Sequence, residues 1–337
     1  GVYCFDPTGK IIAHPKSPAG TCIIYKDRRG YYWISNGKAL YSYNPYTGSY
    51  QQKLTFTSAG IYGMTDDYDG NLYISVYSKG LYIYNVESGA VRILNMQQRG
   101  NKGYLCNDWV RSMALDHTNH LWVGTSNGVS CLNTKTWSFK DFGWNHLLQD
   151  HQANAICEGD NGEIVIGTEE GLYEFDRKKN KLVPFPNAEA LKGKQVCGIV
   201  KDKQGDLWIS TTMGIWQYEK NGNRLTNREY VLGSFMHTSD DLTAFGTSDG
   251  ITAFYPEVVK ANKMELGNVY LTNFLVDGEP INCHAERFSI PYSQNSFTLE
   301  FSLLNYKNTD NISFQYRINE GKWNSTNEGV NAISFNK

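Results

Sequence analysis

Short apolar runs separated by polar turns recur along the first 255 residues of the chain. The clearest copy spans residues 116–133, where a polar turn precedes the apolar Leu121–Val123 and a glycine opens the next apolar run. That glycine recurs with spacings of 48, 43, 43 and 36 residues, at Gly80, Gly128, Gly171, Gly214 and Gly250. Periods of this length are typical of the four-stranded blades of a β-propeller. Because one such unit cannot bury its apolar face alone, the repeats are predicted to stack on one another.

Each repeat can be divided into four antiparallel strands. The first is a short apolar run such as residues 110–115, and an Asp-x-x-Gly turn such as Asp202–Gly205 leads to the second strand. We expect the turn aspartate to accept hydrogen bonds from backbone N–H groups two or three residues further on. The second strand carries a tryptophan at one equivalent position in three repeats, which predicts packing between blades rather than ligand contact, at Trp33, Trp122 and Trp208.

The strand count leaves the closure of the ring open. Six repeats supply the first three strands of a blade, residues 1–13 match the third and fourth strands of another, and the repeat stops at Pro256. A ring of six blades closed by the N-terminal pair and a ring of seven with one incomplete blade both satisfy the need to pair sheet edges. We favour seven blades. Since Gly1–Asp6 matches the middle of a repeat, we expect the chain to be a piece of a longer protein.

Composition narrows the function classes. The chain has 32 Lys and Arg against 34 Asp and Glu, a net charge of -2, and no basic stripe, so nucleic acid is not an expected partner. No apolar run reaches the roughly 18 residues of a membrane helix. The seven cysteines show no CxxC pair, and several fall at apolar strand positions, which predicts buried free thiols. No cofactor or metal is expected.

The repeat resembles the two-component regulator propeller. The segment from Asp202 to Thr211 reads Asp-Lys-Gln-Gly-Asp-Leu-Trp-Ile-Ser-Thr, and residues 254–278 resemble the link that follows the last blade in that family. Residues 290–301, with 305–308 and 314–318, resemble the start of the family's small sandwich, the Y_Y_Y domain. The resemblance implies an all-β chain: a β-propeller of six to seven four-stranded blades over residues 1–258, then a partial Ig-like β-sandwich over residues 264–337. The sandwich is expected to be incomplete, because the chain reaches Lys337 before the family's Pro-Gly-x-Tyr strand.

The same resemblance implies a function. Proteins of this kind are periplasmic sensor regions of hybrid two-component systems, so the chain is expected to be a non-catalytic domain that detects an oligosaccharide breakdown product. An upstream propeller and downstream transmembrane and kinase modules are expected in the parent protein, with a homodimer as a further option. Two alternatives stay open: a propeller enzyme resembling the streptogramin lyases, and a scaffold that binds only protein.

Candidate ligand contacts follow from aligning the first strands on the turn aspartate. One equivalent position near the mouth of the central channel then holds Cys22, Tyr62, Arg111, Asn154 and Cys197. Arg111 is the sole charge among them and could bind a carboxylate or sulfate through two N–H groups. The alternative is that Arg111 bonds backbone carbonyls of the next blade. Trp109 could stack on a sugar ring or be structural.

Two long connections add candidates. Residues 95–104 form the largest insertion between repeats and offer Arg99, Lys102 and Tyr104, while a second connection carries Trp144 beside His146. Binding residues concentrate on loops held by a rigid scaffold, so these side chains are predicted to contact a glycan. The alternative is that the loops contact an upstream propeller.

Overall fold

The computed structural model describes residues 1–6, 10–56, 60–98, 104–142, 148–221, 224–229, 235–238, 240–247, 250–261, 269–282, 287–291, 293–294, 296–303, 314–327 and 329–335. The chain divides into two compact units, Gly1–Val258 and Val259–Lys337. Each unit is described by itself.

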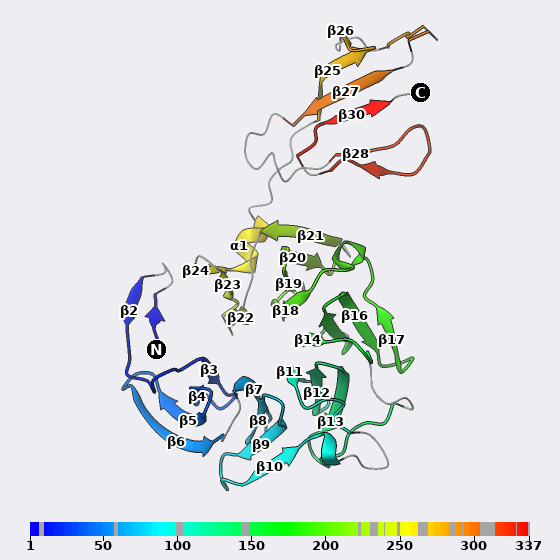
Figure 1. The fold of residues 1–337 in the computed structure, drawn as a ribbon. Coiled ribbons are helices and arrows are strands. Elements are labelled where there is room, and N and C mark those ends of the chain that lie inside the picture. The colour runs from blue at the N-terminus through cyan, green and yellow to red at the C-terminus, as the bar shows by residue number, and fades with distance from the viewer. Residues whose placement is uncertain are drawn as a thin grey trace. The chain divides into compact units, whose positions relative to one another are not determined.

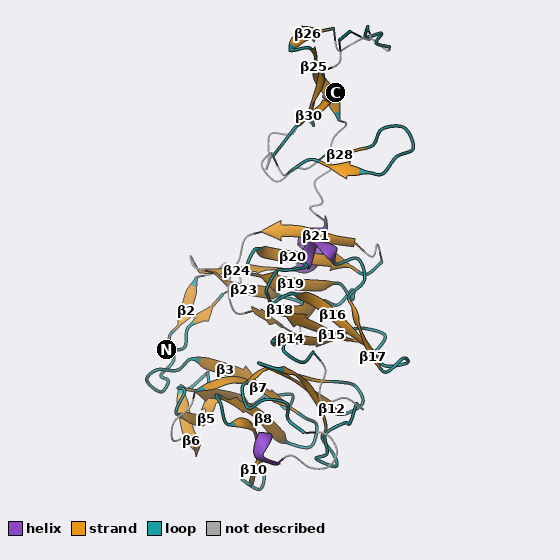
Figure 2. Ribbon diagram, turned by 45° about the vertical axis from the view of Figure 1, so that its right-hand side comes forward, coloured by secondary structure: helices purple, strands orange, loops and turns teal. Residues whose placement is uncertain are grey.

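The first unit is a ring of antiparallel sheets, which confirms the predicted all-β propeller fold (Figures 1 and 2). We number its blades in chain order. Blade 1 consists of β3 (Ile23–Lys26), β4 (Tyr32–Ser35), β5 (Ala39–Asn44) and β6 (Ser49–Thr55). Blade 2 consists of β7 (Ile61–Asp66), β8 (Asn71–Val76), β9 (Gly80–Asn85) and β10 (Val91–Leu94). Blade 4 consists of β14 (Ala153–Glu158), β15 (Ile164–Thr168), β16 (Gly171–Asp176) and β17 (Lys181–Pro184), and blade 5 of β18 (Val196–Lys201), β19 (Leu207–Thr211), β20 (Gly214–Glu219) and β21 (Arg224–Glu229).

Two blades have three strands in the described part of the chain. Blade 3 consists of β11 (Val110–Leu115), β12 (His120–Thr125) and β13 (Gly128–Asn133), and its fourth strand is reduced to one bridge between Leu132 and Phe139. Blade 6 consists of β22 (Phe235–His237), β23 (Thr243–Thr247) and β24 (Gly250–Phe254). After β24 the chain enters the helix α1 (Pro256–Ala261), whose first residue is a proline, a residue suited to that position. The sequence predicted only that the repeat ends there.

The N-terminal residues form a separate pair of strands. The strands β1 (Cys4–Phe5) and β2 (Ile11–Ala13) pair with each other, and both views place β2 between blade 6 and blade 1 in the ring (Figures 1 and 2). Val2 packs in a small core with Ile34 and Tyr43 of blade 1. The described ring therefore holds six repeats and one two-stranded pair.

The Asp-x-x-Gly turns are fixed by a buried carboxylate. Asp116 Oδ1 accepts the backbone N–H groups of Thr118 at 2.8 Å and His120 at 2.9 Å, which lie two and four residues further on. The expectation of bonds two or three residues on is therefore wrong for the second bond: the acceptor spans the whole turn to the first residue of β12. The other oxygen, Oδ2, accepts the indole N–H of Trp122 at 2.8 Å.

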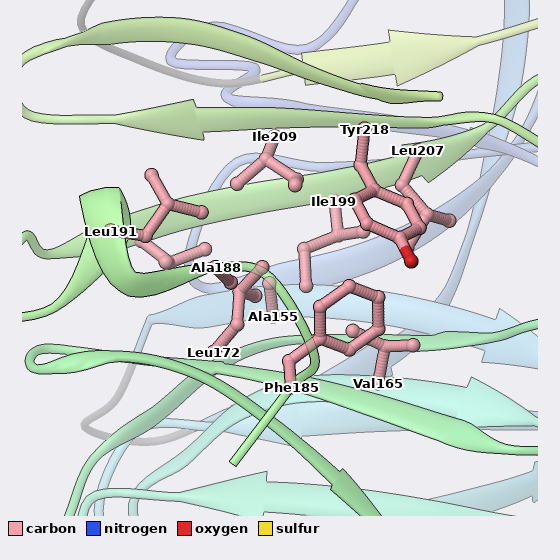
Figure 3. Packing of buried hydrophobic residues seen from close by; sticks show 11 residues of the cluster. Ala155, Val165, Leu172, Phe185, Ala188, Leu191, Ile199, Leu207, Ile209 and Tyr218 are labelled. Carbon is pink, nitrogen blue, oxygen red and sulfur yellow. The ribbon is translucent and has the colours of Figure 1, made fainter. Parts of the chain in front are cut away.

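The same bond between turn and second strand recurs around the ring. It joins Asp27 to Trp33 and Asp202 to Trp208, each at 2.9 Å, and Asp67 to the hydroxyl of Tyr73 at 2.8 Å, in equivalent positions. The three tryptophans are at most 2% exposed, as predicted for core residues. Each contacts an aromatic ring of the following blade, in the pairs Trp33–Tyr84, Trp122–Phe175 and Trp208–Phe254. The core is thus a series of layers between blades, one of which is drawn in Figure 3.

The second unit contains two sheets. Its larger sheet has the strand order β26 (Glu279–Ile281), β25 (Tyr270–Val276), β27 (Phe297–Ser302), β30 (Ala332–Phe335), and β28 (Gln315–Tyr316) pairs with β29 (Asn324–Ser325). Phe274 and Ile333 are buried on the larger sheet. The identity of this unit as an Ig-like sandwich stays a prediction. In the described parts of both units, no helix is long and apolar enough to cross a membrane.

Candidate ligand-binding site

The predicted ring position coincides with a β-bulge in blades 2 to 5. In each innermost strand the pairing register shifts across one residue, for example between Val110 and Ser112 of β11. The residue passed over is, in blade order, Tyr62, Arg111, Asn154 and Cys197. A bulge re-aims the side chain of its extra residue. The strands concerned, β7, β11, β14 and β18, surround the centre of the ring (Figure 1), whereas Cys22 lies just before β3.

Arg111 is held by side chains rather than by carbonyls. Its Nε donates to Ser126 Oγ at 2.8 Å, and its Nη1 lies 3.4 Å from Asn154 Oδ1. Asn154 in turn donates to the carbonyl of Val196 on blade 5 at 3.2 Å. Both described hydrogen bonds of Arg111 thus go to side chains and none to a backbone carbonyl of blade 4, where the Ala153 carbonyl accepts the hydroxyl of Ser112 at 2.8 Å. Of the five N–H donors of the guanidinium, three have no described partner.

One of three neighbouring aromatic rings lies against this guanidinium. Its Cζ lies 4.5 Å from the ring centroid of Trp109, a cation–π distance. Tyr77 meets Trp109 edge-on at 4.8 Å, and Tyr62 lies 5.5 Å from Tyr77 and 6.4 Å from Trp109. Tyr62 is 54% and Tyr77 37% exposed. We call Tyr62, Tyr77, Trp109, Arg111 and Asn154 the Arg111 cluster.

Two residues of this site were missed by the sequence alignment. Tyr77 and Ser126 each follow the second strand of their blade, and the equivalent residue of blade 4 is Glu169. Glu169 accepts the backbone N–H of Gln152 at 2.7 Å and lies 3.4 Å from His151 Nδ1. Aligning these first turn residues, as was done for the first strands, would have found all three.

Four further predicted contacts come from the two long connections. Arg99, Lys102 and Trp144 lie outside the described residues. Tyr104 is described, and its carbonyl accepts a hydrogen bond from Ser130 Oγ on β13 at 2.9 Å. No three His, Cys, Asp or Glu residues in the described ranges are grouped so that they could hold a metal ion.

The Arg111 cluster offers two kinds of recognition side by side. The unused guanidinium donors can form charge-assisted hydrogen bonds with a carboxylate or sulfate. The exposed tyrosine faces are platforms against which a flat or ring-shaped ligand can pack. Trp109 Nε1 is buried and has no described partner, so a ligand acceptor reaching it would satisfy an orphaned donor.

The fold and the turn motif define a β-propeller protein. The family model of the two component regulator propeller matches residues 104–127 and 190–213, which include the turn and second strand of blade 3 and of blade 5. No curated protein matches the sequence.

Solved structures share the fold at low sequence identity. The extracellular domain assigned to the hybrid two component system BT3049 of B. thetaiotaomicron is 20% identical with a TM-score of 0.71, covering 99% of this chain and 48% of that one. The corresponding domain of BT4673 from the same organism is 16% identical with a TM-score of 0.58, covering 99% and 49%. Virginiamycin B lyase from Staphylococcus aureus is 12% identical with a TM-score of 0.57, covering 74% and 86%. The chain spans about half the length of the two sensor domains.

Proposed function

We propose that this chain is part of the ligand-sensing ectodomain of a hybrid two-component sensor, located in the periplasm. The support is the match of two repeats to the regulator propeller and the likeness of nearly the whole chain to two extracellular domains of such systems. In this proposal the chain performs no catalysis, and the second unit is the family's Y_Y_Y sandwich.

The ligand in this proposal is an acidic oligosaccharide fragment that binds the Arg111 cluster. The observation that carries it is a partly buried guanidinium with three donors to spare, stacked on Trp109 and flanked by exposed tyrosines. A uronic acid or a sulfated sugar presents an anion next to a ring with apolar C–H faces. Both features match the groups at the site.

Calorimetric titration with uronic acid-containing disaccharides, beside their neutral counterparts, tests this assignment. Arg111→Ala is expected to weaken binding of the acidic sugar by about 1–3 kcal/mol, the range for a lost hydrogen bond to a charged group. The matched control is Arg92→Ala. Arg92 also lies over a tryptophan, with its Cζ 5.4 Å from the Trp137 ring, but it is on the outer strand β10. Its removal should leave affinity unchanged.

Each other outcome has a defined meaning. Equal affinity in a folded Arg111→Ala variant would show that the cluster is not the site. Turnover of any sugar would favour the propeller enzyme, and absence of binding across the panel would favour a scaffold that binds protein.

A further inference from the structure

The junction between blades 4 and 5 departs from the pattern of the others. Blade 4 has Gly159 where blades 1, 2, 3 and 5 have the turn aspartate, and Val165 where they have a tryptophan or tyrosine. Glu163 makes one of the hydrogen bonds of the missing aspartate: its Oε2 accepts the backbone N–H of Asn161, two residues after Gly159, at 2.9 Å. A Cβ atom on Gly159 would collide with the carboxylate of Glu163. The glutamate therefore occupies the place where the aspartate lies in the other turns.

The groups that surround the tryptophan at another junction nevertheless have counterparts at the junction between blades 4 and 5. Around Trp122 they are an acid, two rings and a cation: Asp116, Phe142, Phe175 and Arg177. The junction between blades 4 and 5 presents the same four kinds of group, namely Glu163, Phe185, Tyr218 and Lys220. Two of these are equivalent by strand position, because Tyr218 is the fifth residue of β20 as Phe175 is of β16, and Lys220 and Arg177 each follow two residues later.

Val165 packs in the same core layer as Phe185 and Tyr218, but it is fully buried and does not itself line the cavity at this junction. The four groups line this cavity, which we call the socket and which has a volume of about 490 Å³, within the range of small-molecule sites. Phe185 meets Tyr218 edge-on at 4.8 Å, with Val165 beside it (Figure 3). Lys220 Nζ is fixed by Asp160 Oδ2 at 2.6 Å, as Arg177 is fixed by Asp116 at 2.7 Å.

A second carboxylate faces the same space. Glu174 pairs with Val165 across β15 and β16 and lines the cavity, where the equivalent residue of blade 3 is the buried Cys131. No donor in the described part of the chain bonds the Glu174 carboxylate. Burial raises the pKa of Glu174, and the nearby carboxylates of Glu163 and Asp176 raise it further. The carboxylate of Glu174 thus has no described donor, although Arg177, Lys178 and Lys220 also line the cavity.

We propose that this socket binds a flat bicyclic aromatic molecule with a ring N–H, of the size of indole. In three other junctions an indole occupies the equivalent position and donates its N–H to a carboxylate. Here the ligand ring packs against Phe185 and Tyr218 and donates to Glu163. A cationic substituent on the ring pairs with Glu174. Of the cations that also line the cavity, Arg177 and Lys220 are already bound to Asp116 and Asp160, so in this proposal the site prefers a cationic ligand to an anionic one.

Saturation-transfer NMR and calorimetry on the full 337-residue chain test this with indole and benzofuran, which share a shape but differ in the N–H group. Indole is expected to bind about tenfold more tightly, as a hydrogen bond to a carboxylate implies. Glu163→Gln should reduce this preference and leave benzofuran binding nearly unchanged. Tryptamine should bind more tightly than indole-3-acetate, and Glu174→Gln should narrow that difference.

A variant that places a tryptophan at this junction provides the decisive control. The triple variant Gly159→Asp, Glu163→Asn, Val165→Trp restores the turn and the wedge of the other blades, and it should lose indole binding while its unfolding temperature rises. Arg111→Ala should bind indole normally, because this inference does not rest on the proposed sensing site. Equal binding of indole and benzofuran, or indole binding that persists in a folded triple variant, would overturn the proposal. If the triple variant does not fold, Glu163→Gln with the benzofuran comparison decides alone.

Discussion

The junctions on either side of blade 4 solve the same packing problem in different ways. Between blades 3 and 4, Trp122 fills the space and its N–H is bonded to the buried Asp116, which also binds Arg177 of the next blade. Between blades 4 and 5, Val165 stands at the tryptophan position, a glutamate replaces the turn aspartate, and a cavity remains. The first junction is filled and its polar groups are paired. The second is partly open and contains the carboxylate of Glu174, which no donor among the described residues bonds. In our proposal this junction is available for binding while the others maintain the ring.

The largest expected difference in stability concerns the side chain packed between the blades, which is Trp122 at one junction and Val165 at the other. Trp122→Ala should destabilise the protein by about 3–5 kcal/mol, because it removes the ring from a fully packed layer and leaves a cavity. Val165→Ala should cost only about 2 kcal/mol, since the side chain is small and its removal deletes fewer buried atoms. Urea unfolding of both variants, followed by near-ultraviolet circular dichroism, measures the two values. Equal losses of unfolding free energy would show that Trp122 and Val165 contribute equally to stability.

The next largest effect tests the buried carboxylate. Asp116→Ala should destabilise by about 3 kcal/mol, because it leaves the buried Trp122 indole without its described acceptor and removes one of the two carboxylates that bind Arg177, the other being Glu158. At the other junction, Glu163→Ala should cost about 1 kcal/mol, since the Glu163 carboxylate accepts only one described backbone N–H group, that of Asn161. Unfolding curves at neutral pH give both numbers. A larger loss for Glu163→Ala would reverse the comparison.

The sequence predicted the repeat and the tryptophans packed between blades, but it did not predict that one junction is filled and another is partly open. The period, the turn aspartate and the equivalent tryptophans are local patterns, and they predicted the blades and the burial of Trp33, Trp122 and Trp208. The equivalence of Arg111 with Tyr62, Asn154 and Cys197 also followed from a local alignment, but the bulge at that position did not. Its partners did not, because Ser126 and Asn154 reach it from another turn and another blade.

The cavity between blades 4 and 5 could not be predicted from the sequence either. The sequence shows glycine at 159 and valine at 165, but it does not show whether Phe185 and Tyr218 close the space or leave it open. How far a site collapses around a missing side chain is decided by the packing of its neighbours, which no local pattern encodes.

A smaller expected effect is the pH dependence of the unfolding free energy, which differs between the two junctions. Burial alone would raise the pKa of Asp116, but hydrogen bonds from His120, Thr118, Arg177 and Trp122 outweigh it and lower the pKa to about 2. A carboxyl group with a depressed folded pKa stabilises above its ordinary pKa, and this contribution is lost as the pH falls. Wild type should therefore lose about 2 kcal/mol between about pH 4 and pH 2 that Asp116→Asn does not lose. Unfolding free energies of both proteins across this range measure the difference, and a difference independent of pH would contradict it.

The smallest effect has the opposite sign. Burial and the neighbouring carboxylates raise the pKa of Glu174, so the folded protein holds this proton more tightly than the unfolded chain. Its contribution to stability is therefore present at low pH and is lost as the pH rises above the ordinary glutamate value of 4.5. Glu174→Gln, which stays neutral, should be more stable than wild type at pH 7 by about 0.5 kcal/mol, a value kept small by solvent screening of a half-buried group. Below pH 4 the two proteins should unfold alike. A Glu174→Gln variant that is less stable at pH 7 would mean that the carboxylate is paired and that the junction between blades 4 and 5 is as well satisfied as its neighbour. A more stable one that binds tryptamine less well would show that this junction gives up stability to keep a charge for a ligand.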